Sequence, residues 1–228
     1  MDKYEGICSY PDNYFDWAIV DPPYKIKASR PSIKPDKCKQ KNGRYLKVKR
    51  SNYKHKDWDD ELMNENYFKQ LFRVSKNQII WGCNYQKVLL QGGRLIWDKL
   101  NGLTDQYDCE IAYLSFTKRT DLIYYLWSGM FQGAKVSRDV REALKQKGDK
   151  RLNEKRIHPT QKPVALYFWM LKEYAKQGMK ILDTHTGSAS SLIACEILGF
   201  EYVAFEKDRD IFNDANIRIK KHKQEYLF

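Results

Sequence analysis

The chain has 228 residues and a formal net charge of +12 at pH 7, and this length predicts one domain over residues 1–228. Its five cysteines include no C-x-x-C pair, which argues against a zinc or disulfide framework, and no apolar stretch approaches membrane-spanning length. The first residues also lack the apolar core of a signal peptide. We therefore expect a soluble cytoplasmic protein with free thiols and no membrane partner.

The positive charge is concentrated between residues 25 and 56. This segment holds 13 of the 41 basic residues and one of the 29 acidic ones, so it accounts for the whole net charge. A concentrated basic stretch is the electrostatic footprint expected for a polyanion such as DNA, although a solvated Lys-rich loop would have the same composition. Pro31, Pro35 and Gly43 predict a loop here. The side chains that we assign to nucleic-acid binding are Lys25, Lys27, Arg30, Lys47, Lys49 and Arg50.

Short apolar runs alternate with helical patterns along the chain. The first run, FDWAIV at 15–20, ends in Asp-Pro-Pro and predicts a buried strand that prolines stop. A helix is expected over 60–75, and residues 124–156 show the least regular pattern. The other expected strands are 78–81, 94–97, 110–116, 179–183 and 202–205, and the other expected helices are 163–177, with proline in its first turn, 188–198 and 208–223. This alternation predicts an α/β doubly wound sheet.

Asp21-Pro22-Pro23-Tyr24 follows the first expected strand, at the carboxyl end where open α/β sheets place their ligands. These residues suit the methylation of an aromatic amine, whose nitrogen lone pair is delocalised into the ring. The Asp21 carboxylate and the Pro22 carbonyl can accept its N–H groups and so localise the lone pair, because proline holds that carbonyl in place. Tyr24 offers a flat face for stacking a base that has left the duplex. A simple strand-terminating turn is the alternative interpretation.

A second candidate site is the DTHTGS turn at 183–188, which follows another expected strand. Gly187 lets backbone N–H groups approach a ligand, and the start of the next helix favours negative charge. Glu206 closes the following strand, at a distance from Asp183 typical of nucleotide-binding βαβ units, in which such a residue binds ribose hydroxyls. The turn lacks the G-x-G-x-x-G of nicotinamide sites. We assign His185 a packing or backbone role in this turn in preference to metal binding.

With both motifs in place, the chain resembles the beta-class DNA amino-methyltransferases, particularly the small phage-type adenine-N6 enzymes. The likeness rests on FDWAIVDPPY at 15–24, RIHPTQKP at 156–163 and residues 181–206 with their DTHTGS turn; WGCNY at 81–85 and WDK at 97–99 are weaker likenesses. The motif order defines this permuted class: catalytic motif first, target-recognition region in the middle, cofactor motif last. The resemblance implies a Rossmann-like S-adenosylmethionine-dependent methyltransferase sheet.

The resemblance also implies individual roles. Asp21, Pro22 and Tyr24 would hold a flipped adenine of double-stranded DNA. S-adenosylmethionine would be the cofactor, with no metal, and Lys162 would supply a cation for its carboxylate. The short irregular segment within 124–156 would recognise the target sequence. The residues implied to form the cofactor pocket are Asp183, Thr184, His185, Gly187, Ser188, Glu206, Thr160, Gln161 and Lys162.

The chain departs from the family pattern at three places. Lys25 stands where glycine usually follows D-P-P-Y, and Ala189 replaces the second glycine of the cofactor turn. Only about a dozen residues precede the first expected strand, so the strand that usually precedes it is expected to be short or missing.

Three other functions stay open on the sequence. Cytosine-N4 methylation uses the same amine chemistry, but such enzymes in this class tend to carry serine in place of Asp21. The related RNA methyltransferases usually have tryptophan in place of Tyr24. A non-catalytic nucleic-acid-binding module would bind the donor without turnover. Relatives in this class are often dimers, so a homodimer is expected. The expected location is the cytoplasm of a bacterium or of a phage-infected host. A role in restriction-modification and a role as a solitary phage enzyme both stay open.

Overall fold

The structure is a computed structural model that describes residues 5–26, 37–39, 43–47, 56–102, 107–128 and 131–225. Its strands are β1 (Phe15–Val20), β2 (Lys37–Lys39), β3 (Tyr45–Lys47), β4 (Ser75–Trp81), β5 (Gly93–Asp98), β6 (Cys109–Leu114), β7 (Thr120–Tyr124), β8 (Lys180–Asp183) and β9 (Glu201–Ala204). Its helices are α1 (Glu5–Cys8), α2 (Glu65–Val74), α3 (Val140–Ala143), the 3-10 helix η1 (Lys150–Leu152), α4 (Val164–Tyr174), α5 (Ser190–Leu198) and α6 (Arg209–Glu225).

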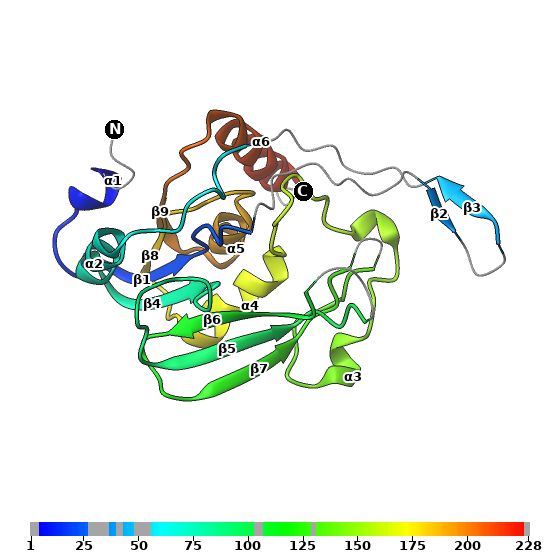
Figure 1. The fold of residues 1–228 in the computed structure, drawn as a ribbon, viewed down its shortest axis with the longest axis horizontal. Coiled ribbons are helices and arrows are strands. Elements are labelled where there is room, and N and C mark those ends of the chain that lie inside the picture. Colours follow the sequence, from blue (N-terminus) through cyan, green and yellow to red (C-terminus); the bar gives the residue numbers. More distant parts are fainter. Residues whose placement is uncertain are drawn as a thin grey trace.

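Seven of these strands form one sheet in the order β7-β5-β6-β4-β1-β8-β9 (Figure 1). β1 is parallel to both β4 and β8, β8 is parallel to β9, and β5 is parallel to β7. Among the described strands of this sheet, β6 alone runs against its neighbours, β4 and β5. A mostly parallel sheet requires crossover connections that cover its faces with helices. The α/β doubly wound fold expected from the sequence is confirmed.

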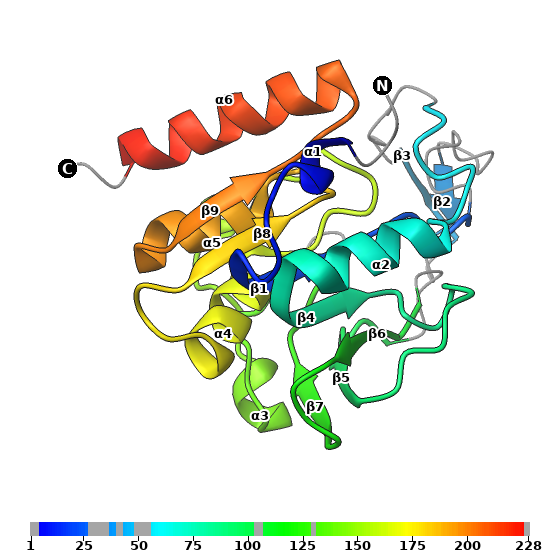
Figure 2. The ribbon, with the colours of Figure 1, turned by 90° about the vertical axis from the view of Figure 1, so that its left-hand side faces the viewer.

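Helices cover both faces of the sheet (Figure 2). On one face, Leu71 and its neighbours on α2 pack against Ala18 and Val20 of β1. On the other face, Trp17 and Ile19 of β1 pack with the apolar side chains of α4 and α5. α6 packs outside α5. Because β1 is buried on both faces, its sequence is a nearly continuous apolar run without a clear alternation.

The expected elements are present, with shifted ends. α2 begins at Glu65, not near residue 60, because the Asn64 side chain accepts a hydrogen bond from the Tyr67 amide and caps the helix there. Pro163 is the N-cap of α4 and does not lie within its first turn. β7 has no counterpart among the expected strands. Its residues alternate between exposed and buried positions, and the apolar run LIYYLW at 122–127 extends past its end into the stretch with the least regular pattern.

Part of the basic segment 25–56 forms a hairpin, where a loop was expected. β2 and β3 pair antiparallel, with Cys38 opposite Leu46, and lie apart from the main sheet in Figure 1. Gly43 lies between them with φ +78, a left-handed backbone conformation that glycine adopts without strain. The two prolines that predicted a loop lie outside both strands, so they do not interrupt the pairing. The assigned side chains of Lys27, Arg30, Lys49 and Arg50 lie outside the described residues.

Between β7 and α4 the chain is built of short pieces. They are α3, η1 and isolated bridges such as Tyr124 with Ser137. This agrees with the irregular pattern at 124–156, while the role of that segment in target recognition stays a prediction. In the part of the chain that the structure describes, no helix combines the length and apolar character needed to cross a bilayer.

The packing of α2 on β1 makes a stability prediction. Leu71 is 0% exposed and Leu89 is 83% exposed. We expect Leu71→Ala to lower the free energy of unfolding by about 2–5 kcal/mol, because it removes buried surface and leaves a cavity. Leu89→Ala should change it by less than about 0.5 kcal/mol. Urea unfolding of the two variants measures the difference, and equal effects would contradict the packing described for α2.

Candidate active site

The catalytic and cofactor motifs meet at one edge of the sheet. β1 and β8 are parallel neighbours, with Trp17 opposite Ile181 and Ala18 opposite Leu182. β9 lies on the other side of β8 in the same direction. The carboxyl ends of these strands therefore lead into D-P-P-Y, the DTHTGS turn and Glu206 at the same edge, which is where open α/β sheets bind ligands.

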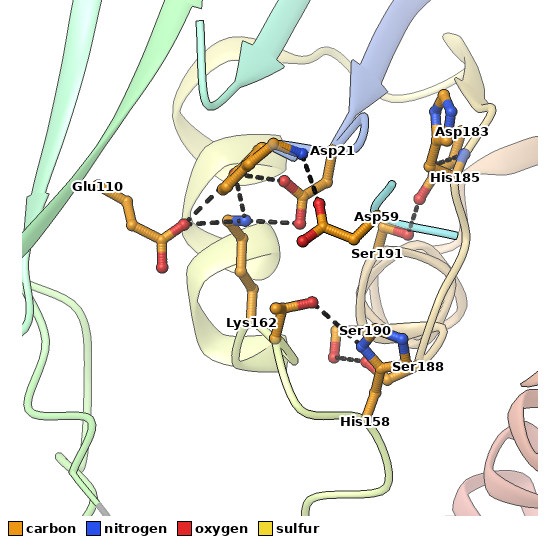
Figure 3. Close-up of polar contacts among 12 residues, drawn as sticks. Asp21, Asp59, Glu110, His158, Lys162, Asp183, His185, Ser188, Ser190 and Ser191 are labelled. Carbon is orange, nitrogen blue, oxygen red and sulfur yellow. Dashed lines mark hydrogen bonds and ion pairs between the residues drawn. The ribbon is translucent and has the colours of Figure 1, made fainter. Parts of the chain in front are cut away.

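A cluster of charged side chains lies at the end of β1 (Figure 3). The Lys162 ammonium is 2.5 Å from Asp21 Oδ2 and 3.0 Å from Glu110 Oε2. On its other side, Glu110 pairs with Lys99 at 2.7 Å. The Lys162 side chain is only 2% exposed. With Asp21 ionised, the cluster contains two cations and two anions, so its buried charges are mutually compensated.

The cluster sets the protonation of its members. Burial raises the pKa of Asp21, with Lys162 opposing that shift. Burial also disfavours ionisation of Glu110, but Lys162 and Lys99 outweigh it and lower the pKa of Glu110 to about 2. Although burial disfavours the charged form of Lys162, Asp21 and Glu110 raise its pKa, so it stays protonated. Of the two carboxylates, Asp21 is the one more readily protonated.

Tyr24 lies between the charged cluster and an aromatic cavity. Its hydroxyl donates to Asp21 Oδ1 at 2.5 Å and accepts from Lys162 at 2.9 Å. Its ring stacks on Tyr85, with ring centroids 4.8 Å apart and an interplanar angle of 13°. Tyr24, Tyr85, Tyr107 and Glu110 all line a cavity of about 240 Å³. The cavity has stacking faces beside a carboxylate, which suits a planar ligand with amino groups.

Gly82 is what allows the Tyr24 ring to lie where it does. This glycine follows β4 at φ +61, and a Cβ added to it would lie 2.0 Å from Cε1 of Tyr24. Any side chain at this position would therefore overlap the ring. The WGCNY segment noted in the sequence thus supplies a required gap at Gly82 and a stacking partner at Tyr85.

Asp183 is enclosed by its own turn. It is 3% exposed, and its carboxylate accepts hydrogen bonds from the His185 amide at 2.9 Å and from the Ser191 hydroxyl. Burial raises its pKa to about 7. Thr184 Oγ1 contacts both the Tyr67 hydroxyl, at 2.7 Å, and His185 Nδ1, at 2.9 Å. Asp183 and Thr184 therefore fix the shape of the turn.

His185 is held within this turn. Burial lowers its pKa to about 4, so its imidazole is neutral at physiological pH. Its ring meets the Tyr67 ring at 75°. Across the described residues, no group of three or more His, Cys, Asp or Glu side chains is arranged to hold a metal ion. The packing or backbone role of His185 stays a prediction.

Glu206 joins the turn to the end of β9. Its Oε2 accepts from the Gly187 amide and its Oε1 from the Asp208 amide, each at 2.9 Å. Gly187 and Ala189 both lie in the left-handed region, at φ +52 and +62. A Cβ added to Gly187 would meet no atom closer than 3.9 Å, so the space above the turn is open. Ser188 is buried, and its hydroxyl contacts that of Ser190 at 3.1 Å.

The residues of the HPTQKP segment contact two different sets of side chains: Lys162 contacts the charged cluster, whereas Thr160 and Gln161 contact residues 154–158. Lys162 contacts Asp21, Glu110 and Tyr24, so the structure places its ammonium with the catalytic motif and not against the cofactor turn. Gln161 is 5% exposed and its amide donates to Glu154. Thr160 Oγ1 contacts His158 Nδ1 at 3.1 Å.

Three further residues of the site have no role assigned from the sequence. Glu110 and Lys99 complete the charged cluster, and Asp59 accepts hydrogen bonds from the backbone after Tyr24. The WDK segment ends in Lys99, and Glu110 is a lone acidic residue at the start of an apolar strand. Of the assigned basic residues, Lys25 is described and exposed, while only the backbone of Lys47 is described.

The α/β fold, with D-P-P-Y and the DTHTGS turn at the carboxyl ends of neighbouring strands, is the arrangement of a nucleotide-binding site. The model of the N6/N4 DNA methylase family matches residues 15–217. The chain therefore belongs to the DNA methylase family.

Two solved structures of similar proteins, with TM-scores above 0.5, share this fold. The PvuII DNA methyltransferase (cytosine-N4-specific) is 11% identical, with a TM-score of 0.53 over 100% of this chain and 89% of that chain. The putative DNA modification methylase TTHA0409 from Thermus thermophilus, complexed with S-adenosyl-L-methionine, is 12% identical, with a TM-score of 0.51 over 97% of this chain and 91% of that chain. The M1.HpyAVI–SAM complex is 18% identical, with a TM-score of 0.49 over 96% of each chain.

The close approach of Gly82 to Tyr24 predicts a matched pair of outcomes. Gly82 and Gly102 both have φ +61, but a Cβ at Gly102 would meet nothing within 4 Å. Gly82→Ala should therefore lower methyl transfer to DNA by at least about 10-fold, because the new methyl displaces the Tyr24 ring. Gly102→Ala carries the same backbone strain and should stay within about threefold of the wild type. Equal activities of the two variants would contradict this role of Gly82.

Proposed function

We propose that this protein transfers the methyl group of S-adenosylmethionine to the N6 amino group of a flipped adenine in double-stranded DNA. The observation that carries the proposal is the Asp21 carboxylate, which stands at the carboxyl end of β1 and accepts the hydroxyl of Tyr24, a residue that lines an aromatic cavity of about 240 Å³. Asp21 and the Pro22 carbonyl accept the N–H groups of the target amine, which localises its lone pair for attack. Tyr24 stacks on the base.

The ion pair with Lys162 has a function in this proposal. It restrains Asp21 from one side through Oδ2, while Oδ1 accepts the Tyr24 hydroxyl. The target amine takes over the position of that hydroxyl at Oδ1. Because burial raises the pKa of Asp21, its carboxylate is also suited to accept the proton that the amine loses on methylation.

The residues of the cofactor turn fit the donor. The N-terminus of α5 and the open space above Gly187 suit the carboxylate of a methionine moiety. Glu206, at the end of β9, suits ribose hydroxyls. When bound, S-adenosylmethionine supplies an electrophilic methyl group on a sulfonium. Asp183, Thr184 and His185 hold the turn in shape, and the chemistry requires neither a metal nor a covalent enzyme intermediate.

Adenine is favoured over cytosine by one residue. Position 21 is aspartate, where cytosine-N4 enzymes of this permuted class tend to carry serine.

The basic segment 25–56 follows the catalytic motif and supplies the charge that binds the DNA backbone. The irregular segment 124–156 recognises the target sequence, and a homodimer would extend the short recognition surface. An RNA substrate and a binding-only module are outcomes that the next experiment separates.

The direct test is transfer of labelled methyl from S-adenosylmethionine to unmodified double-stranded DNA, followed by nucleoside analysis. We expect N6-methyladenine from the wild type and a loss of at least about 100-fold with Asp21→Ala, because an acceptor at the reacting centre is removed. Asp12→Ala, which changes an exposed carboxylate paired with Arg73, is the matched control and should retain activity. N4-methylcytosine as the product, transfer to RNA alone, or donor binding without transfer would each overturn the proposal.

The charged cluster predicts opposite pH shifts for two substitutions. Activity requires ionised Asp21, so kcat/KM falls as pH drops through the pKa of Asp21. Lys162 lowers that pKa and Glu110 raises it. Lys162→Met should therefore move the acid limb to higher pH, and Glu110→Gln should move it to lower pH. A pH–rate profile of each variant measures the limb, and shifts in the same direction would show that Asp21 is not the titrating group.

A further inference from the structure

Asp59 receives three consecutive backbone N–H groups from the loop that leaves the catalytic motif. Its Oδ1 accepts from the amides of Tyr24, at 2.9 Å, and Lys25, at 2.8 Å, and its Oδ2 accepts from the amide of Ile26, at 3.1 Å. Asp59 is 1% exposed, and it lies beside Asp21 in Figure 3. Hydrogen bonds from successive amides to one buried carboxylate are strong, because the acceptor is charged and shielded from water.

The loop needs this support at Lys25. That residue has φ +58, in the left-handed region that a side chain with a Cβ disfavours. Successive N–H groups in such a turn point to one side and form a concave site for an anion. Asp59 is the anion that occupies it. Glycine, the residue usual at this position in the resembled family, would adopt the same backbone without strain.

Asp59 is itself anchored to the rest of the site by its neighbours. The ring of Trp58 packs on His158 of the HPTQKP segment, with ring centroids 4.8 Å apart. Lys56 forms ion pairs with Asp208 at 2.8 Å and with Asp210 at 2.7 Å. The stretch 56–59 therefore crosses from the cofactor side of the site to the catalytic loop, and it holds the Asp59 carboxylate at a fixed point between them.

We propose that Asp59 is the positioning residue of the catalytic loop: it holds the backbone of residues 24–26 in the strained conformation that aims Tyr24 and the Pro22 carbonyl at the target base. The prolines at 22 and 23 fix the first half of the loop. Asp59 fixes the second half, and it does so without touching the base. The inference rests on the proposed function, because its test measures methyl transfer, but it applies to any base that the site methylates.

Asp59→Asn tests this role, with Asp60→Asn as the matched control. Asp60 is the adjacent, exposed carboxylate. The carboxamide that replaces the Asp59 carboxylate cannot accept all three N–H groups, so we expect kcat for methyl transfer to fall about 10- to 100-fold, as misplacement of reacting groups by about 1 Å does. The dissociation constant for S-adenosylmethionine should stay within about twofold, because the three amides that donate to Asp59 belong to the catalytic loop. Asp60→Asn should leave kcat unchanged.

A suppressor separates positioning from general stability. Lys25→Gly and Lys25→Ala remove the same charge, but only glycine removes the penalty of the left-handed backbone. The loss of kcat caused by Asp59→Asn should therefore be about fivefold smaller in the Lys25→Gly background than in the Lys25→Ala background. Equal losses in the two backgrounds, or a wild-type kcat in Asp59→Asn, would overturn the proposal.

Amide hydrogen exchange gives a readout that needs no turnover. Asp59→Asn should speed exchange at Tyr24, Lys25 and Ile26 at least about 10-fold while the amides of β1 keep their protection. Unchanged exchange at the three amides, or a uniform increase throughout the sheet, would contradict a local positioning role. If the wild type methylates cytosine, the proposed adenine specificity fails, but the kcat ratio and the exchange pattern still test Asp59.

Discussion

The site depends on the parallel pairing of β1 with β8 within the seven-stranded sheet. Trp17 and Ala18 lie opposite Ile181 and Leu182, although most of the chain separates the two strands in sequence. Both strands are buried between helix layers, so a slip of one residue would turn every side chain to the wrong layer. The register is therefore fixed by packing, and it brings the ends of β1 and β8 to the same edge.

Charge compensation then organises the catalytic edge. Asp21 directly follows the buried strand β1, and an isolated carboxylate at that position would be costly to ionise. Lys162 supplies the opposite charge, and Glu110 and Lys99 complete a neutral set. These four side chains come from four separate segments of the chain. The cluster thus joins β1, β5, β6 and the segment before α4, and the same contacts that stabilise the edge tune the pKa of Asp21.

Much of the fold could be predicted because its signals are local. The apolar run of β1, the prolines after it and the glycine turn after β8 each specify a short piece of backbone. The misses have physical reasons. β7 begins with the polar residues Thr120 and Asp121 and merges with an apolar run that continues to residue 127, and the hairpin of β2 and β3 follows the two prolines that suggested a loop. The N-terminal end of α2 depends on a hydrogen bond from Tyr67 to Asn64, which composition does not show.

The sequence by itself determined the strand–turn–helix units, the residue types at D-P-P-Y and at the DTHTGS turn, and the concentration of positive charge in 25–56. Only the tertiary structure decided the partners of the charged residues. Lys162 belongs to the motif that the resemblance linked to the donor, yet its ammonium lies on Asp21. Glu110 and Asp59 likewise lie in the site only through tertiary contacts, Glu110 with Lys162 and Asp59 with the backbone of Tyr24. The reason is that a buried charge is placed by compensation across distant strands, and a local pattern contains no information about which partner lies within reach.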